Sequence, residues 1–433
     1  MARGPATRKS SAKPGSGVRR RVRAPRGRPR MALALAGGGP FGAIYEIGAL
    51  MALQESMDGV DLNDLDVYVG VSAGSFLAAA LANGFHVAEI YGIFIEGEKE
   101  EGALTPEVFM RPAFREYFQR ARSVPSILMR SLWQYVRQPL SRGALESFAT
   151  LGRAIPTGIF DNDTIHRKLQ AVFTQAGRTD DFRKLKRRLY LVATDLDSGE
   201  SVSFGRPGHD HVPISQAVQA SAALPGLFPP VEIDGRSFVD GALKKTLHAS
   251  EALDDGAKLV ICVNPLVPYD AGLAAEKGRG RHRRLVEGGL PVVLSQTFRA
   301  IIHSRMAVGI SKYRSQYRDA DVVLFEPDAD DSEIFFTNIF SYSTRAALCE
   351  HAYDRTRRDL LRRRHELEPL LARHGVRLRI DVLQDASRRI GLKPGPRQKA
   401  LPAMWRLPTA AAELRDTLVE LRRWLAAKDR APA

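Results

Sequence analysis

The fold is decided by the stretch Val67-Tyr-Val-Gly-Val-Ser-Ala-Gly-Ser75, in which an apolar, β-prone run leads directly into a turn of small residues. An Ala- and Leu-rich segment of helical composition follows over 76–82. This strand–turn–helix order is the context in which the letters G-x-S-x-G form a nucleophile elbow. Gly70 and Gly74 would let strand and helix approach closely, and Ser72 would project from the tip of the turn. The stretch therefore predicts a nucleophilic serine, the alternative being a loop that only enters a core helix.

A second glycine-rich turn lies upstream, after an apolar strand predicted over 31–36. It reads Gly37-Gly-Gly-Pro-Phe-Gly42, and apolar residues at helical spacing follow over 43–56. Such a turn is an anion site, because unpaired backbone N–H groups point outward at the start of a helix. The anion is either a nucleotide phosphate, since the first, third and sixth residues satisfy the letters G-x-G-x-x-G, or the oxyanion formed when a nucleophile attacks an ester. The nearby Ser72 favours the oxyanion.

A third candidate is an aspartate at the end of a predicted hairpin. Residues 231–240 read as two strands joined by a turn at Asp234-Gly235, and the second strand leads into Asp240-Gly241-Ala242. The glycine allows a sharp exit from the strand and lets the carboxylate lie close to another backbone segment. Taken alone, an Asp-Gly pair is also a common turn, so the catalytic interpretation depends on the other two motifs.

Composition limits the class of protein. The chain has 433 residues, 44% hydrophobic and 26% charged, which is enough to bury a large core in one main domain with additions. No run of about 18 apolar residues occurs, so no transmembrane helix is expected. The two cysteines, Cys262 and Cys349, form neither a metal-binding spacing nor a disulfide framework, which indicates a reducing compartment. No metal-binding cluster is evident in the sequence, so no metal is expected.

The basic charge is concentrated at the start of the chain. The formal net charge is +15, but eleven Lys and Arg residues and no acid lie in 1–30, which leaves +4 for the rest, so nucleic acid is not an expected partner. This segment is poor in apolar residues, and we expect it to be a disordered basic tail. We expect a cytoplasmic protein whose tail binds anionic lipid at the inner face of the membrane. A passive tail, or a true start at Met31, is the alternative. The triplet Arg19-Arg20-Arg21 suggests an export signal, but the apolar run after it is too short.

The rest of the chain divides by composition. The main domain is expected over 31–310 and contains a lid or cap insertion over 85–160. A helical extension with a further strand follows over 311–390. The chain closes with a linker and a C-terminal amphipathic helix over 391–433. The insertion contains an amphipathic stretch over 124–137 that either meets lipid or packs on the core. Strands are also predicted over 188–194, 201–204, 258–263 and 322–325, and helices over 214–224, 292–313 and 345–373.

Taken together, four motifs resemble the patatin-like phospholipase family in order and spacing: 37–42, 70–74, 220–230 and 240–242. The resemblance covers about 31–265. It implies an α/β fold, with a three-layer α/β/α domain and a mainly parallel central sheet, to which the helical C-terminal extension is added. It also implies hydrolysis of ester-linked acyl chains from lipids, as in a phospholipase A, a lysophospholipase or a carboxylesterase, without a cofactor.

The resemblance assigns a role to each motif residue. Ser72 would be the nucleophile and Asp240 its partner in a Ser–Asp dyad. Three glycines would donate to the oxyanion, namely Gly37, Gly38 and Gly39. The remaining motif residues would support the turns, namely Gly42, Gly70, Gly74, Gly241 and Ala242.

Elementary chemistry agrees with a dyad. A serine hydroxyl is inert at pH 7 without a base, and an exposed aspartate with a pKa near 3.9 is a poor one. Burial would raise the pKa of Asp240 and make it a better base. The chain departs from the family at Phe41, where Arg or Lys is usual, and mildly at Ala242, where glycine is commoner. A neutral ester is therefore an alternative substrate.

Three other interpretations stay open. The order Ser72, Asp240 and then His248 or His303 would permit a conventional catalytic triad. The same site would transfer acyl groups to an alcohol if a lid excluded water. A non-catalytic scaffold at the membrane is the third interpretation, and it does not explain why the serine, the aspartate and the glycines occur together. The sequence makes no prediction of oligomeric state.

Overall fold

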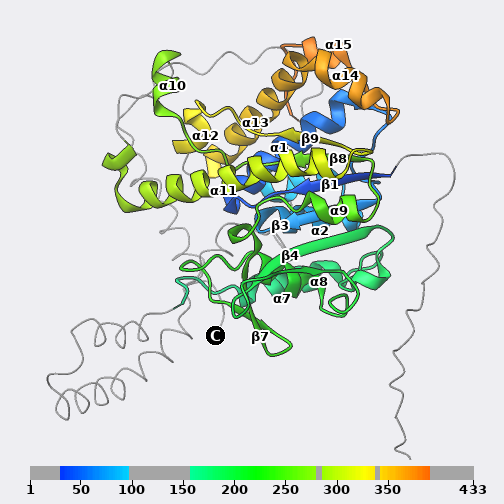
Figure 1. Cartoon of the computed structure of the whole chain (residues 1–433), viewed down its shortest axis with the longest axis vertical. Helices are drawn as coiled ribbons and strands as arrows, with labels where there is room; N and C mark the ends of the chain where they lie inside the picture. Colours follow the sequence, from blue (N-terminus) through cyan, green and yellow to red (C-terminus); the bar gives the residue numbers. More distant parts are fainter. Residues whose placement is uncertain (1–29, 97–156, 279–284, 337–341, 391–433) are drawn as a thin grey trace, which may run out of the picture.

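The computed structural model describes residues 30–96, 157–278, 285–336 and 342–390 (Figure 1). Within these residues, a central sheet is covered by helices on both faces. Three predicted segments lie wholly or largely outside the described residues: the basic tail, the greater part of the 85–160 insertion, and the linker and helix over 391–433.

Eight strands of the described residues form the sheet in the order β6-β7-β4-β3-β1-β8-β9, with β5 also pairing along β4. The five neighbouring strands β4, β3, β1, β8 and β9 run parallel to one another. Strands β5 and β7 are antiparallel to β4. The mainly parallel sheet is thereby confirmed. The strands are β1 (Met31–Leu35), β3 (Val67–Val71), β4 (Arg188–Asp195), β5 (Ser201–Phe204), β6 (Val231–Ile233), β7 (Arg236–Asp240), β8 (Leu259–Val263) and β9 (Asp321–Phe325).

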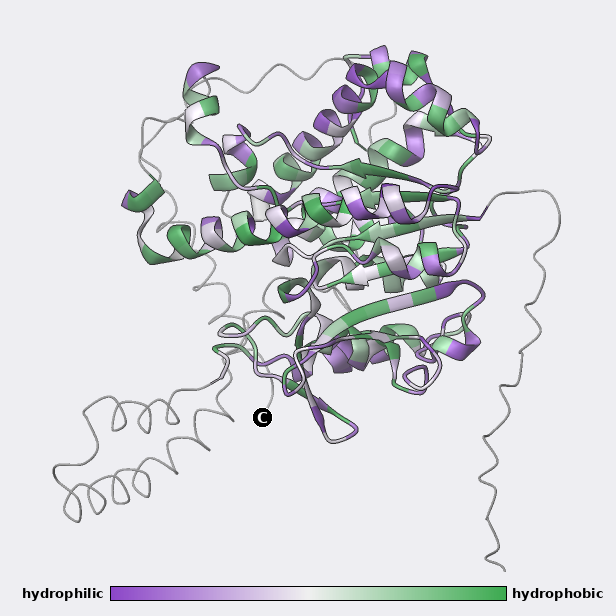
Figure 2. Ribbon diagram, viewed as in Figure 1, coloured by the Kyte–Doolittle hydropathy of each residue, from purple (hydrophilic) through white to green (hydrophobic). Residues whose placement is uncertain are grey.

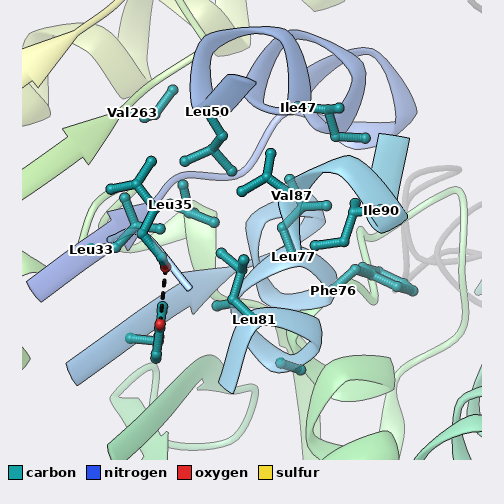
Figure 3. Close-up of a cluster of buried hydrophobic side chains, with 14 of the residues drawn as sticks. Leu33, Leu35, Ile47, Leu50, Phe76, Leu77, Leu81, Val87, Ile90 and Val263 are labelled. Carbon is teal, nitrogen blue, oxygen red and sulfur yellow. Dashed lines mark hydrogen bonds between the residues drawn. The ribbon is translucent and has the colours of Figure 1, made fainter. Parts of the chain in front are cut away.

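The central strands are buried on both faces, as continuous apolar runs in a parallel sheet require. Side chains alternate along β1: Leu33 and Leu35 enter one core, while Ala32 and Ala34 enter the other. Figure 3 shows Leu33 and Leu35 in the first core, with leucines of the helices that cover them. The alanines leave room for helices to pack close to the opposite face.

Helices α1 and α2 cover the first face, and α9 and α11 cover the second. Helix α13 packs across α1, where a Cβ on Gly48 would lie 2.9 Å from the Cβ of Ala352. The α-helices are α1 (Gly39–Ser56), α2 (Ala73–Ala82), α3 (Val87–Tyr91), α7 (Asp163–Phe173), α8 (Ile214–Ser221), α9 (Ala249–Asp254), α10 (Ala271–Glu276), α11 (Gly289–Gln316), α12 (Ser332–Phe336), α13 (Tyr342–Arg362), α14 (Arg364–Ala372) and α15 (Ile380–Gln384). A two-stranded ribbon of β2 (Met57–Asp58) and β10 (Arg377–Leu378) lies at the far end of α1.

Two helix predictions need correction. The helix expected over 43–56 begins four residues earlier, at Gly39, inside the glycine turn. The helix expected over 345–373 is instead two helices that meet at Arg363, whose backbone has φ −92° and ψ 11°. The Arg363 guanidinium donates to the carbonyl of Leu324 on the edge strand β9, a tertiary contact that the helical pattern does not reveal. None of the described helices is long and apolar enough to cross a membrane.

Candidate active site

Ser72 occupies a strained turn between β3 and α2. Its backbone has φ 51° and ψ −122°, a positive φ that non-glycine residues seldom adopt. The two flanking glycines are sterically required. A Cβ on Gly70 would lie 2.6 Å from the Cα of Ser75, and one on Gly74 would lie 2.6 Å from the carbonyl oxygen of Leu35. Strand, turn and helix therefore hold the Ser72 hydroxyl at the carboxyl edge of the sheet.

Asp240 lies beside this hydroxyl although 168 residues separate the two in the chain. The Ser72 Oγ donates a hydrogen bond of 2.6 Å to Asp240 Oδ2, and both residues are buried. The pairing of strands explains the proximity, because β4 lies between β3 and β7 and places Val192 opposite Val71 and Ala193 opposite Asp240. The other carboxylate oxygen of Asp240 accepts from the backbone N–H of Ala242 at 2.8 Å.

Gly241 makes this approach of β7 to β4 feasible, because a Cβ there would overlap the carbonyl oxygen of Val192. Burial raises the pKa of Asp240 from its ordinary value of 3.8 to about 6, although the hydrogen bonds from Ser72 and Ala242 act in the opposite direction. The carboxylate is thus ionised at neutral pH and binds a proton more strongly than an exposed aspartate does.

The glycine turn after β1 lies against the serine. A Cβ on Gly37 would lie 2.9 Å from the Cβ of Ser72 and 3.6 Å from its Oγ. The carbonyl oxygen of Ala36 accepts from the N–H of Gly74 at 3.2 Å, which joins the two turns. The N–H groups of Gly37 and Gly38 donate to no described residue. Backbone donors beside a buried hydroxyl suit an anion that forms there.

Gly39 has a φ of +61° and begins α1, so the turn needs glycine at this position as well. Gly42 lies against Pro265, whose Cγ would be 2.9 Å from an added Cβ. These two glycines shape the turn that presents its N–H groups to the site.

Ser221 is a site residue that the sequence reasoning missed. Its Oγ accepts from the backbone N–H of Ser72 at 2.9 Å and donates to the carbonyl of Val192 at 2.6 Å. The side chain thereby ties the elbow to β4 from the end of α8. The only sequence signal was its place in the small-residue stretch over 220–230.

A pocket opens from the Ser72 hydroxyl. Arg345, a buried side chain from α13, is the one charged residue among its described lining. The other lining residues are small or apolar, namely Gly39, Pro40, Ala43, Ile44, Ala73, Phe76, Phe94, Ile165, Ala222, Leu224, Leu227 and Phe228. The pocket therefore combines an apolar wall with the guanidinium of Arg345, from the C-terminal part of the chain.

Phe41 is buried and does not line the pocket. The guanidinium of Arg299, from α11, lies 5.2 Å from the centre of its ring, and the Nη1 atom donates to the carbonyl of Val267. A cation is thus present beside residue 41, but it belongs to a helix more than 240 residues further along the chain.

The two histidines of the alternative triad lie elsewhere. His248 is buried at the start of α9, where burial and the charge of Lys245 lower its pKa to about 3. His303 on α11 faces Glu326, with 3.6 Å between Nε2 and Oε1. Among the described residues, the partners of the Asp240 carboxylate are Ser72 and Ala242, and neither histidine stands between serine and aspartate. No group of three metal-binding side chains occurs in the part of the chain that the structure describes.

These features define a class: an α/β protein in which a buried Ser–Asp pair, beside a glycine turn, opens into an apolar pocket. A family model described as "Patatin-like phospholipase" matches residues 33–253, just over half of the chain. The protein belongs to the patatin-like phospholipase family.

Two relatives match parts of the sequence. An uncharacterised protein of Acanthamoeba polyphaga mimivirus is 24% identical over 48% of this chain and 57% of its own length. An uncharacterised NTE family protein of Mycobacterium tuberculosis is 40% identical over 17% of this chain and 19% of its own length. The matches therefore span between about a fifth and just over half of these relatives.

Two solved structures are similar at low sequence identity. VipD from Legionella pneumophila is 16% identical, with a TM-score of 0.35 over 81% of this chain and 68% of that one. The type III effector ExoU of Pseudomonas aeruginosa is 15% identical, with a TM-score of 0.33 over 76% of this chain and 52% of that one.

Proposed function

We propose that the protein hydrolyses acyl esters of lipids, with Ser72 as nucleophile and Asp240 as general base. The observation that carries the proposal is the 2.6 Å hydrogen bond from the Ser72 Oγ to a buried carboxylate. Serine needs such a base, and a pKa of about 6 is closer to neutral pH than that of an exposed aspartate. A conventional triad is disfavoured, because direct contact leaves no place for an imidazole between the two side chains.

The chemistry proceeds in two halves. Asp240 accepts the proton of Ser72 as Oγ attacks the ester carbonyl carbon, and the carbonyl oxygen becomes an oxyanion. Collapse of this intermediate breaks the bond to the leaving alcohol, which takes the proton from Asp240 and leaves an acyl-serine. Water then attacks the acyl-serine while Asp240 accepts its proton; the second collapse returns that proton to Ser72 and releases the fatty acid.

The glycine turn supplies the oxyanion donors in this scheme. The N–H groups of Gly37 and Gly38 have no partner among the described residues and lie next to the hydroxyl, and Gly39 follows at the positive end of α1. Loss of one such donor in other enzymes costs about 10²–10³ in rate. Gly42 shapes the same turn, while Gly70, Gly74, Gly241 and Ala242 hold the serine and aspartate in contact.

The pocket indicates the substrate class. Its apolar wall suits an acyl chain, and the Arg345 guanidinium suits an anionic group such as a phosphodiester. Arg345 therefore favours a phospholipid or lysophospholipid over a neutral ester, even though Phe41 replaces the usual cation of the family.

Product analysis tests the proposal. The wild-type protein and Ser72→Ala would be incubated with phosphatidylcholine, a monoacylglycerol and a medium-chain p-nitrophenyl ester, with and without added glycerol. We expect the wild type to release free fatty acid, fastest from the phospholipid, and the variant to release none. Acyl-glycerol as the main product would instead establish acyl transfer. A folded wild type that consumes none of the three substrates would contradict the proposed function.

A further inference from the structure

Exposed apolar side chains gather on one helix. Of the eleven large apolar residues exposed among the described residues, seven belong to α11 or the turn before it. Five of them form what we call the α11 apolar face: Leu290, Val293, Leu294, Phe298 and Ile301. Single exposed apolar residues are ordinary on a protein surface, but a contiguous row marks an interaction site.

The helical spacing places this row away from the body of the protein. Leu290, Leu294, Phe298 and Ile301 recur every three or four residues, and therefore share one side of α11. The opposite side is anchored: Met306 is buried, and Gln296 exchanges hydrogen bonds with the backbone of Tyr269. Figure 2 shows hydrophobic residues along the projecting first half of α11.

Topology places the α11 apolar face at the active-site edge of the sheet. Helix α11 connects β8 to its parallel neighbour β9, so it runs against the strand direction and starts near their carboxyl ends (Figure 1). Ser72 and the glycine turn lie at the same edge. Two contacts support this placement of α11 near the site. Arg299 lies over the ring of Phe41, and Arg305 donates to the carbonyl of Leu243, three residues after Asp240.

The charge of α11 selects the partner. Residues 289–316 contain no Asp or Glu, and three basic residues, Arg305, Lys312 and Arg314, are exposed. The preceding turn carries one exposed acid, Glu287, but α11 itself carries only positive charge, and Arg305 follows Ile301 by one helical turn. Such a helix fits an anionic lipid surface, into which the apolar side chains insert while Arg305 meets the head groups. Since α11 cannot cross a membrane, the fitting geometry is a helix lying in the interface.

We propose that the α11 apolar face docks the protein on an anionic lipid bilayer, and thereby brings the mouth of the Ser72 pocket to the membrane. The docking itself needs no catalysis, whereas its purpose, the supply of a lipid substrate, rests on the proposed function. The face and the pocket are built by different parts of the chain, since α11 lies outside the residues that match the family model.

Vesicle sedimentation tests this docking. The full chain would be mixed with vesicles of phosphatidylglycerol and phosphatidylcholine, and with phosphatidylcholine alone. The double variant Leu294→Glu/Phe298→Glu should lower binding to the anionic vesicles at least tenfold. The matched control, Gln384→Glu/Ala386→Glu, adds the same charge at exposed positions near the end of α1, at the opposite edge of the sheet, and should bind like wild type. Unchanged thermal melting would show that all variants fold.

A second measurement makes the contact specific to one position. Cys262 and Cys349 are buried, so a thiol-reactive, environment-sensitive dye would label an added surface cysteine selectively. Dye at Phe298→Cys should shift to the blue when anionic vesicles are added, and dye at Gln384→Cys should not.

Three results would overturn the docking proposal: wild type that does not bind anionic vesicles, full binding by Leu294→Glu/Phe298→Glu, or a dye at residue 298 that responds to protein concentration but not to lipid. The last would assign the face to a second copy of the chain. All measurements can be repeated with Ser72→Ala, in which docking should persist. Failure of the proposed enzyme activity would therefore be distinguished from failure of docking.

Discussion

The Oγ of Ser72 lies 2.6 Å from Oδ2 of Asp240 and donates a hydrogen bond to it, with both groups buried at the carboxyl edge of the sheet. The contact joins the turn after β3 to the last residue of β7, and β4 lies between these two strands. The proposed Ser–Asp dyad requires this contact.

The activity should follow the ionisation of Asp240. Its pKa is about 6, and only the carboxylate can accept the Ser72 proton. We expect kcat/KM to be level above pH 7, to halve near pH 6, and to fall about tenfold per pH unit below that. The measurement is a pH profile with an uncharged ester, checked by circular dichroism at pH 5. A midpoint near pH 4 would contradict burial of the base.

Asp240→Asn should make the folded protein more stable while it removes activity. The folded protein binds the Asp240 proton more tightly than the unfolded chain does, so stability from this group is present at low pH and is lost as pH rises through about 6. An ionised Asp240 therefore costs about 2–3 kcal/mol at pH 7, from a pKa shift of about two units. Thermal melting of the two proteins at pH 7 and pH 4.5 checks the sign. The Asn variant should melt higher at pH 7, with a smaller difference at pH 4.5; a lower melting temperature at pH 7 would contradict this prediction.

Gly37→Ala should inactivate the site, because the new Cβ would lie 2.9 Å from the Cβ of Ser72 and 3.1 Å from that of Ala242. We expect kcat to fall at least 100-fold, since both the serine and the oxyanion donors are displaced. Gly84→Ala provides the control: it has a φ of +83° with no atom within 4 Å, so it should cost about 1 kcal/mol of stability and leave kcat unchanged. Equal kcat for Gly37→Ala and wild type would exclude the glycine turn from the site.

Replacement of the histidines separates a dyad from a triad. His303→Gln should keep kcat within about threefold of wild type, because this side chain faces Glu326 rather than Asp240. His248→Asn should also retain activity, with some loss of stability from repacking of a buried residue. Either variant, if folded and at least 100-fold slower, would favour a triad formed after rearrangement.

Much of the fold could be predicted from the sequence because the central strands are buried on both faces. Continuous apolar runs marked β1, β3, β4 and β8 within a residue or two of their observed bounds. Pro369 inside the predicted helix 345–373 signals an interruption, but it lies within α14 and not at the break. The position of the break, at Arg363, accompanies a contact with β9 that no local pattern records.

The candidate site divides in the same way. Ser72, Asp240 and the glycine turns carry local letter patterns, and the structure brings the two side chains together, although their catalytic roles stay predictions. Ser221 and Arg345 carry no such pattern. Ser221 reaches the site because α8 ends beside β4, and Arg345 because α13 packs across α1. Such contacts join segments far apart in the chain, so no local periodicity records them.

Labelling with a fluorophosphonate, followed by mass spectrometry of the modified peptide, identifies the nucleophile. The wild type should take up about one label per chain, attached to Ser72. Folded Ser72→Ala should take up none, and Asp240→Asn should react at least 100-fold more slowly. Equal labelling of Ser72→Ala, or a label on Ser221 in the wild type, would contradict the assignment of Ser72 as the nucleophile.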